Sequence, residues 1–84
     1  MIGELKNNWE EKDNKLFIRT KQENFTDCVE LKNKIARIAE EQNHHPNLFI
    51  KEYRILEIEI YTHDENTVTE KDWKLAVEID DLLR

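Results

Sequence analysis

Glycine, proline and cysteine are nearly absent from this chain of 84 residues, in which each occurs once, as Gly3, Pro46 and Cys28. A single glycine excludes the glycine-rich loops that hold phosphates in the common nucleotide-binding motifs. A single cysteine excludes a disulfide framework and a zinc site built from cysteines. We interpret Cys28 as a small buried hydrophobic residue rather than a reactive thiol, because it lies in a helical pattern with nothing nearby that would favour the thiolate.

Long hydrophobic runs are also missing. The longest comprise three residues, as at 16–18 and 48–50, whereas a membrane-spanning helix needs about 20 apolar residues. We therefore expect no membrane span and no signal peptide, and hence a cytoplasmic protein.

The charge balance is acidic, with 19 acidic and 13 basic residues and a net charge of −6. Such a chain has no basic surface for direct nucleic-acid binding. Ile, Leu, Val and Phe supply 23 of the 84 residues, which is above the roughly 20% below which charged chains stay disordered. We expect one small domain over residues 1–84, with so little core that further burial in a homo-oligomer is favoured.

Alternation of apolar and polar residues predicts three strands. Residues 1–11 show no sustained period, although we expect Trp9 to pack against the rest of the chain. A turn at Asp13-Asn14 is followed by the first strand, and one face of the last strand carries Leu56, Ile58, Ile60 and Thr62. The predicted strands are residues 15–21, 48–50 and 53–63.

Two segments follow the period of a helix instead. The first begins at Phe25 behind a cap at Asn24 or Thr26, and it ends near Asn43 because Pro46 disfavours helical backbone before it. The second follows a loop at 64–68 and begins at Thr69, which forms a capping-box pattern with Asp72. The order is β-α-β-β-α, which indicates an α+β protein with two helices on one face of an antiparallel sheet.

The three histidines are the residues best suited to chemistry. His44 and His45 precede Pro46 at the end of the first helix, and His63 ends the last strand. The ends of such elements can converge, and converging imidazoles have three interpretations. They could bind a metal ion, they could transfer protons as groups that titrate near neutrality, or each could hydrogen-bond nearby backbone in a structural role.

Two carboxylates, those of Asp72 and Glu40, also have both a structural and a functional interpretation. Asp72 could simply cap the second helix, or it could belong to a site if the start of that helix faces the histidines. Glu40 lies four residues before His44, where it could orient an imidazole or belong to the solvated surface. Spacing alone leaves both alternatives open.

Four stretches together resemble the pterin-4a-carbinolamine dehydratase family, whose vertebrate members are also known as a dimerization cofactor of a homeodomain transcription factor. They are AEEQNHHP at 39–46, THD at 62–64, TEKD at 69–72, and the pairs Leu75-Ala76 and Ile79-Asp80. The resemblance extends from about Trp9 to Leu83. It implies the fold derived above and an enzyme that dehydrates 4a-hydroxytetrahydropterin to quinonoid dihydropterin, which recycles the pterin cofactor of aromatic amino-acid hydroxylation without a metal or other cofactor.

The resemblance also implies the site residues. Around the pterin it places His44, His45, His63 and Asp72. Because imidazoles can both give and take a proton near neutrality, we assign His44 and His63 to proton transfer and His45 chiefly to holding substrate. Asp72 or Glu40 would fix the tautomer of an imidazole. The further residues expected to contact the pterin are Glu40, Pro46, Thr62, Asp64 and Glu65. Family members form dimers and tetramers, so we expect a homodimer or homotetramer, whereas any other protein partner cannot be identified from the sequence.

Three positions depart from the family pattern. Leu48 stands where a tryptophan is usual, which would remove an aromatic wall of the site. The loop 65–67 lacks the usual glycines, so that only Asn66 is suited to a positive φ. One extra residue precedes His63, which we place near Lys51-Glu52 as a bulge or a longer turn. These departures keep a second function open, a non-catalytic pterin-binding or protein-assembly module on the same fold.

Overall fold

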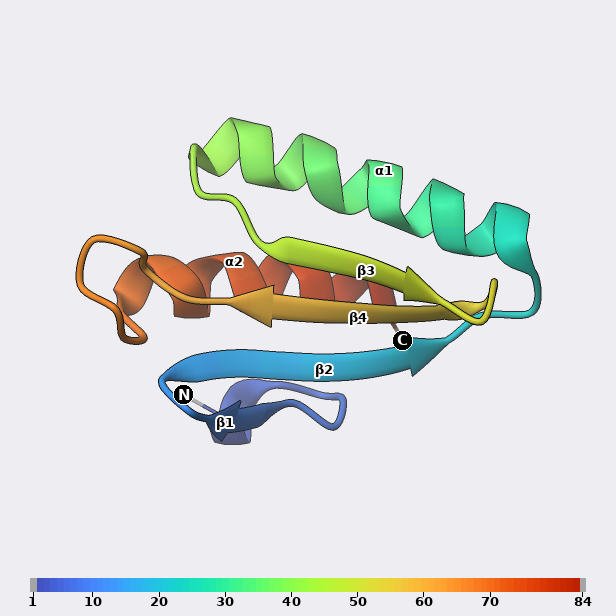
Figure 1. Cartoon of the computed structure of the whole chain (residues 1–84). Coiled ribbons are helices and arrows are strands. Elements are labelled where there is room, and N and C mark those ends of the chain that lie inside the picture. The colour runs from blue at the N-terminus through green and yellow to red at the C-terminus, as the bar shows by residue number, and fades with distance from the viewer. Residues whose placement is uncertain (1, 84) are drawn as a thin grey trace.

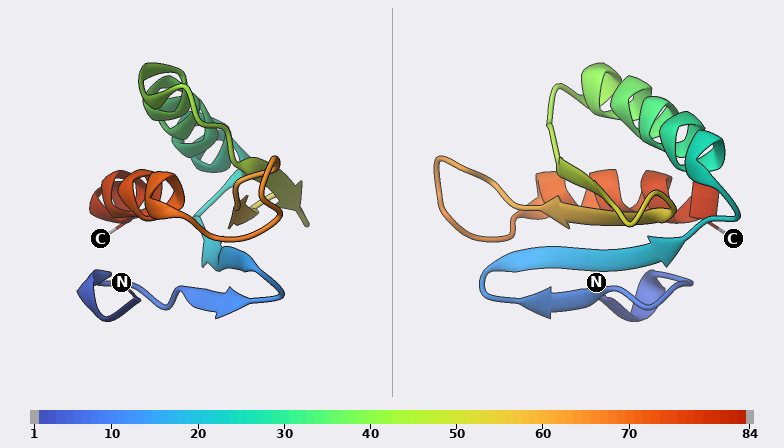
Figure 2. Two further views of the ribbon diagram at one scale, coloured as in Figure 1. Left: turned by 90° about the vertical axis from the view of Figure 1, so that its left-hand side faces the viewer. Right: turned by 45° about the vertical axis from the view of Figure 1, so that its right-hand side comes forward.

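The computed structural model describes residues 2–83, and its elements follow the predicted β-α-β-β-α order with two additions near the N-terminus. The four strands form one antiparallel sheet in the order β1-β2-β4-β3 (Figure 1), and both helices lie on the same side of it (Figure 2). The predicted α+β class and the placement of the helices are confirmed. The elements are the 3₁₀ helix η1 (Ile2–Glu4), β1 (Glu10–Lys12), β2 (Lys15–Lys21), α1 (Phe25–Gln42), β3 (Asn47–Lys51), β4 (Ile55–Ile60) and α2 (Glu70–Leu83).

Alternation along the two central strands places the core. In β4, Leu56, Ile58 and Ile60 are fully buried, whereas the intervening glutamates are only half-buried. Leu16 and Ile18 repeat this pattern in β2, where they lie opposite Ile60 and Ile58. One face of the sheet is therefore apolar and covered by the helices, as the sequence predicts.

Strand β1 was not predicted. We expected no defined element in residues 1–11, of which the structure describes all but Met1. Instead, β1 pairs with the start of β2 across a turn at Asp13 and Asn14, whose φ angles are 54° and 61°. Two successive positive φ angles are typical of a type I′ hairpin turn. All three residues of β1 are charged and exposed, so no hydrophobic alternation marks this strand in the sequence.

Strand β4 is shorter than the predicted 53–63. Tyr53 lies in the turn between β3 and β4, where Glu52 and Tyr53 have φ angles of 49° and 57°. The pairing of β3 with β4 is regular along its whole length, so the bulge that we considered near Lys51-Glu52 is absent and the chain reverses through a three-residue turn. After β4, Thr62 forms an isolated bridge with Thr67, and Asn66 has the positive φ (52°) expected of it.

Helix α1 begins and ends as predicted. The side chain of Asn24 accepts a hydrogen bond from the backbone N–H of Asp27 at 2.8 Å, and Asn43 closes the helix in the left-handed conformation. Cys28 is buried on the helix face that packs against the sheet. Burial, together with the negative charge of Asp27, raises the pKa of its thiol, which favours the inert protonated form. Neither helix within residues 2–83 combines the length and apolarity needed to cross a membrane.

The buried carboxylate of Asp80 attaches the N-terminal segment to α2. It accepts hydrogen bonds from the backbone N–H of Lys6 (2.6 Å), from the backbone and side chain of Asn7 (3.2 and 2.8 Å), and from Trp9 Nε1 (2.9 Å). Burial by itself would raise the pKa of Asp80, but these hydrogen bonds outweigh it and lower the pKa below its usual value. Trp9 is 6% exposed, so its predicted packing is confirmed.

Replacing Asp80 should therefore destabilise the fold in a pH-dependent way. We expect Asp80→Ala to lower the free energy of unfolding by about 2–4 kcal/mol at pH 7, because it leaves the buried Trp9 donor and the partly buried donors of Lys6 and Asn7 without this partner. The pKa of Asp80 is lower in the folded protein than in the unfolded chain, where it is about 3.9. The difference in unfolding free energy between wild type and Asp80→Ala should therefore be complete above that pH and disappear as the pH falls through the folded pKa. Urea denaturation between pH 2 and pH 7 measures both effects.

The neighbouring Asp81 provides the matched control. Its exposed carboxylate pairs with Lys6 Nζ, at 3.2 Å, so Asp81→Ala should change the stability by less than about 1 kcal/mol. Equal effects of the two substitutions would contradict the anchoring role of Asp80.

Candidate active site

His44 is directed inward because of the way α1 ends. The left-handed conformation of Asn43 turns the chain away from the helix axis, and the backbone N–H of His44 then bonds the carbonyl oxygen of Ala39 at 3.1 Å. The imidazole of His44 is only 12% exposed, and its Nε2 lies 2.5 Å from Oδ1 of Asp72.

Asp72 is fully buried in the first turn of α2, and its second oxygen is also satisfied. Oδ2 accepts hydrogen bonds from the backbone N–H of Thr69 (2.7 Å) and from the hydroxyl of Thr62 (2.8 Å). The Thr69 bond is one half of the predicted capping box. The two alternatives for Asp72 are thus not exclusive in geometry, since one oxygen caps the helix and the other contacts His44.

The hydrogen bonds around Asp72 determine the direction of the neighbouring protons. The hydroxyl of Thr62 donates to Asp72, so in its 2.7 Å contact with Thr69 Oγ1 it must accept, and Thr69 donates. An ionised Asp72 has only acceptors, so Nε2 of His44 carries the proton that is shared with Oδ1. In neutral His44 the basic nitrogen is then Nδ1.

His45 and Glu40 form a separate pair on the surface. Nε2 of His45 lies 2.6 Å from Oε2 of Glu40, and the two side chains are 57% and 76% exposed. Glu40 therefore contacts an imidazole as the sequence suggested, but it contacts His45, whereas Asp72 contacts His44.

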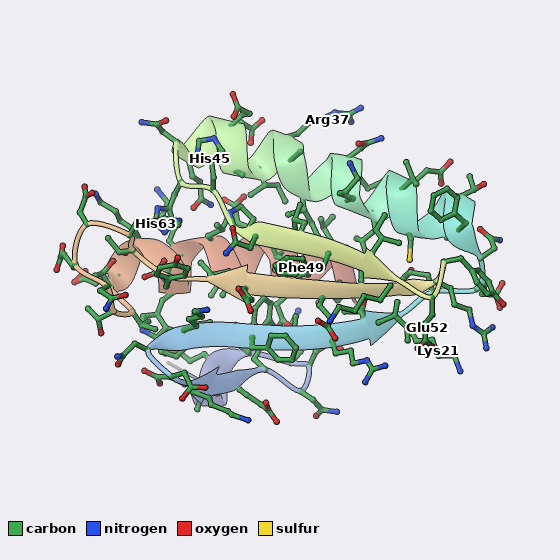
Figure 3. All side chains as sticks on the ribbon, viewed as in Figure 1. Lys21, Arg37, His45, Phe49, Glu52 and His63 are labelled. Carbon is green, nitrogen blue, oxygen red and sulfur yellow. The ribbon has the colours of Figure 1, made fainter. Side chains whose placement is uncertain are left out.

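His63 lies on the loop after β4, at the same end of the molecule as His45 (Figure 3). Its exposed ring packs on Tyr61 with ring centroids 4.3 Å apart. Lys15 of β2 contacts the same tyrosine, with its Nζ 5.2 Å from the centroid of the Tyr61 ring. Tyr61 was not among the predicted site residues, although its alternation with His63 along one face of the chain is a signal that could have identified it. The structure brings His44, Asp72 and Thr62 into one hydrogen-bonded cluster, while His63 has no hydrogen bond to it within residues 2–83.

The other expected contact residues border the same end. Pro46 is half-buried where the chain enters β3, and Asp64 and Glu65 are exposed in the turn, where the backbone N–H of Glu65 bonds Thr62 at 3.1 Å. Thr69 is the residue of the cluster that sequence reasoning assigned only to helix capping. In the part of the chain that the structure describes, no three His, Cys, Asp or Glu side chains are grouped so that they could hold one metal ion.

Comparison with known sequences identifies relatives along nearly the whole chain. The family model of pterin 4 alpha carbinolamine dehydratase matches residues 2–82. A protein of Rickettsia canadensis named as a pterin-4-alpha-carbinolamine dehydratase is 40% identical over 81 residues, which cover 95% of this chain and 73% of the relative. A protein of the same name from Sulfolobus acidocaldarius is 42% identical over 78 residues, covering 93% and 84%.

Solved structures share the fold. A transcriptional coactivator/pterin dehydratase from Brucella melitensis superimposes with a TM-score of 0.87 at 26% identity, covering 99% of this chain and 88% of that one. A pterin dehydratase-like protein described as a RuBisCO assembly factor in the α-carboxysome superimposes with a TM-score of 0.71 at 19% identity, covering 90% and 87%. Since the family model matches almost every residue and two relatives reach 40% identity over most of their length, this chain belongs to the pterin 4 alpha carbinolamine dehydratase family.

Proposed function

We propose that this protein dehydrates 4a-hydroxytetrahydropterin to quinonoid dihydropterin and so returns a pterin cofactor to use. Its family supports the reaction. The contact between Nε2 of His44 and the buried Oδ1 of Asp72 is the observation that carries the proposal, because it pairs a titratable group with a carboxylate that can stabilise its charged form.

The reaction requires one proton donor and one proton acceptor. The bond between C4a and its hydroxyl oxygen breaks, and the leaving oxygen takes a proton from a general acid and departs as water. A general base removes the proton from N5, and the electron pair of that N–H bond forms the C4a–N5 double bond. Each properly placed acid or base contributes on the order of 10²–10⁴ in rate.

The geometry favours His44 as the base. Asp72 holds the protonated Nε2, so Nδ1 is available to accept the N5 proton, and the resulting imidazolium is stabilised by the adjacent carboxylate. We assign the proton donor to His63, whose ring is exposed on the neighbouring loop. His45 with Glu40 would hold the substrate, and the pterin ring would lie against Pro46, Thr62, Asp64 and Glu65.

A non-catalytic pterin-binding or protein-assembly module is the second candidate. Leu48 favours it, because the family resemblance places a tryptophan there, and Leu48 is half-buried against the core. This position therefore has no aromatic side chain that could stack on a pterin. Activity measurements separate the two candidates.

We also propose that the chain forms a homo-oligomer. Strand β3 is at one end of the sheet, so its outer edge is unpaired within residues 2–83, and Phe49 on this strand is 42% exposed (Figure 3). An unpaired edge strand is a template for pairing with another chain, and a second copy would bury apolar surface that the small core lacks.

The catalytic proposal predicts that purified protein accelerates the loss of 4a-hydroxytetrahydropterin, followed by the absorbance of quinonoid dihydropterin. His44→Ala and His63→Ala should each lower kcat by about 10²–10⁴, whereas His45→Ala should mainly raise KM. No acceleration over buffer by the wild-type protein would reject the dehydratase and favour the non-catalytic module.

Asp72 should act as a positioning residue. We expect Asp72→Asn to lower kcat by about 10²-fold or more with a smaller change in KM, because it removes the charge that stabilises the imidazolium of His44. Circular dichroism must first establish that this variant is folded. Thr62→Ser keeps the hydroxyl donor to Asp72 and should retain activity, whereas an equal loss in both variants would indicate a structural effect.

The oligomer proposal predicts that light scattering at micromolar concentration gives a multiple of the 10.2 kDa chain mass. A monomer at that concentration would contradict it.

A further inference from the structure

A hollow of about 310 Å³ lies beside His44, between the end of α1 and the start of α2. Each of its lining residues carries a side-chain nitrogen, and none is a carboxylate. This composition is unexpected in a chain with a net charge of −6 and 19 acidic residues. The lining residues are Gln42, Asn43, His44, Lys71 and Lys74.

The two lysines are not used by the fold. Neither side chain forms an ion pair or hydrogen bond within residues 2–83, and Lys74 does not pair with Glu70 or Glu78, which lie one helical turn away on either side. Lys71 lies in the first turn of α2, where the helix dipole disfavours positive charge, and Lys74 follows in the second turn. Their position is therefore not explained by the stability of the helix.

Gln42 supplies an independent observation. Its Nε2 is the one buried side-chain nitrogen or oxygen without a hydrogen-bond partner in the described part of the chain. A buried donor without a partner is costly, and such groups call for a specific explanation. The hollow is thus lined by two ammonium groups without a partner within residues 2–83 and by Gln42, whose buried amide nitrogen also has none there.

A larger hollow at the opposite end of the sheet does not share these properties. It measures about 450 Å³ and contains Arg19 and Lys21, but Glu52 also lines it (Figure 3), and Arg19 lies 3.8 Å from Glu57. Its positive charge is partly compensated by the chain itself. The hollow beside His44 is therefore the better candidate for an anion.

We propose that the hollow beside His44 binds a phosphate ester on the side chain of the pterin, so that the protein prefers phosphorylated pterins over those with a neutral side chain. This inference rests on the proposed function, because the pterin ring must lie against His44 for its side chain to reach Lys71 and Lys74. Two ammonium groups match the charge of a phosphate monoester, which is between −1.5 and −2 near pH 7, and the ester offers several acceptor oxygens to the surrounding donors.

The test compares neopterin with neopterin monophosphate by fluorescence titration. The phosphate ester should bind roughly tenfold more tightly at low ionic strength, and added salt should reduce this preference because the lysines are exposed. In the double variant Lys71→Gln/Lys74→Gln the preference should fall to about twofold or less. The control Lys21→Gln/Lys34→Gln removes the same charge elsewhere and should keep the preference.

Equal affinity of the wild-type protein for the two pterins would overturn the inference, as would a preference that survives in the Lys71/Lys74 double variant. Both results leave the dehydratase proposal intact, since neopterin still binds. If the protein neither binds neopterin nor turns over 4a-hydroxytetrahydropterin, the proposed function itself fails and the inference falls with it.

Inorganic phosphate distinguishes a free anion from the ester. It should bind far more weakly than neopterin monophosphate when followed by the amide NMR signals of His44 and Lys74. Binding of inorganic phosphate as tight as that of the ester would show a free-anion site and overturn the assignment to the pterin side chain.

Discussion

The buried carboxylate of Asp72 is the constraint on which this end of the molecule depends. A carboxylate that is fully removed from water is strongly destabilising unless hydrogen bonds replace its solvation. Those bonds come from two connections, the one between α1 and β3 through His44, and the one between β4 and α2 through Thr62 and Thr69. The connections must therefore meet at the first turn of α2, and a chain with a single glycine holds these loops by side-chain hydrogen bonds.

Asp80 repeats this arrangement about two turns later on the same helix, where its carboxylate is also buried. Its donors come from the N-terminal segment, through Lys6, Asn7 and Trp9. Helix α2 is thus held by buried carboxylates near both of its ends, and the fully buried Leu75 and Ile79 pack between them. Polar contacts of this kind demand one geometry, whereas a small apolar core could tolerate several.

The sequence predicts the elements whose signals are local. The extents of β2 and α1 follow from alternation, helical period and the Asn24 cap, all of which act over a few residues. Strand β1 is not predicted because its three residues are all charged and exposed, and the strand is defined by its backbone pairing with β2. The start of β4 is predicted too early because tyrosine favours strands, whereas Tyr53 and the preceding Glu52 adopt the left-handed conformation of a turn. Neither residue type indicates this conformation.

The site shows the same division between local and distant contacts. Glu40 lies four residues before His44, a spacing that brings two side chains together only inside a helix. Asn43 leaves the helix in the left-handed conformation, so the imidazole that reaches Glu40 is that of His45. The partner of His44 lies 28 residues away, and no spacing within one element could identify it.

These contacts divide the residues around the proposed site into two groups. His44, Thr62 and Asp72 satisfy one another in the interior, so a change in any of them affects stability as well as chemistry. His45, Lys71 and Lys74 are exposed, and exposed substitutions usually change stability by less than about 0.5 kcal/mol. A domain with little stability in reserve can therefore vary at the exposed positions while the buried carboxylate of Asp72 keeps His44, the proposed proton-transfer group, in place.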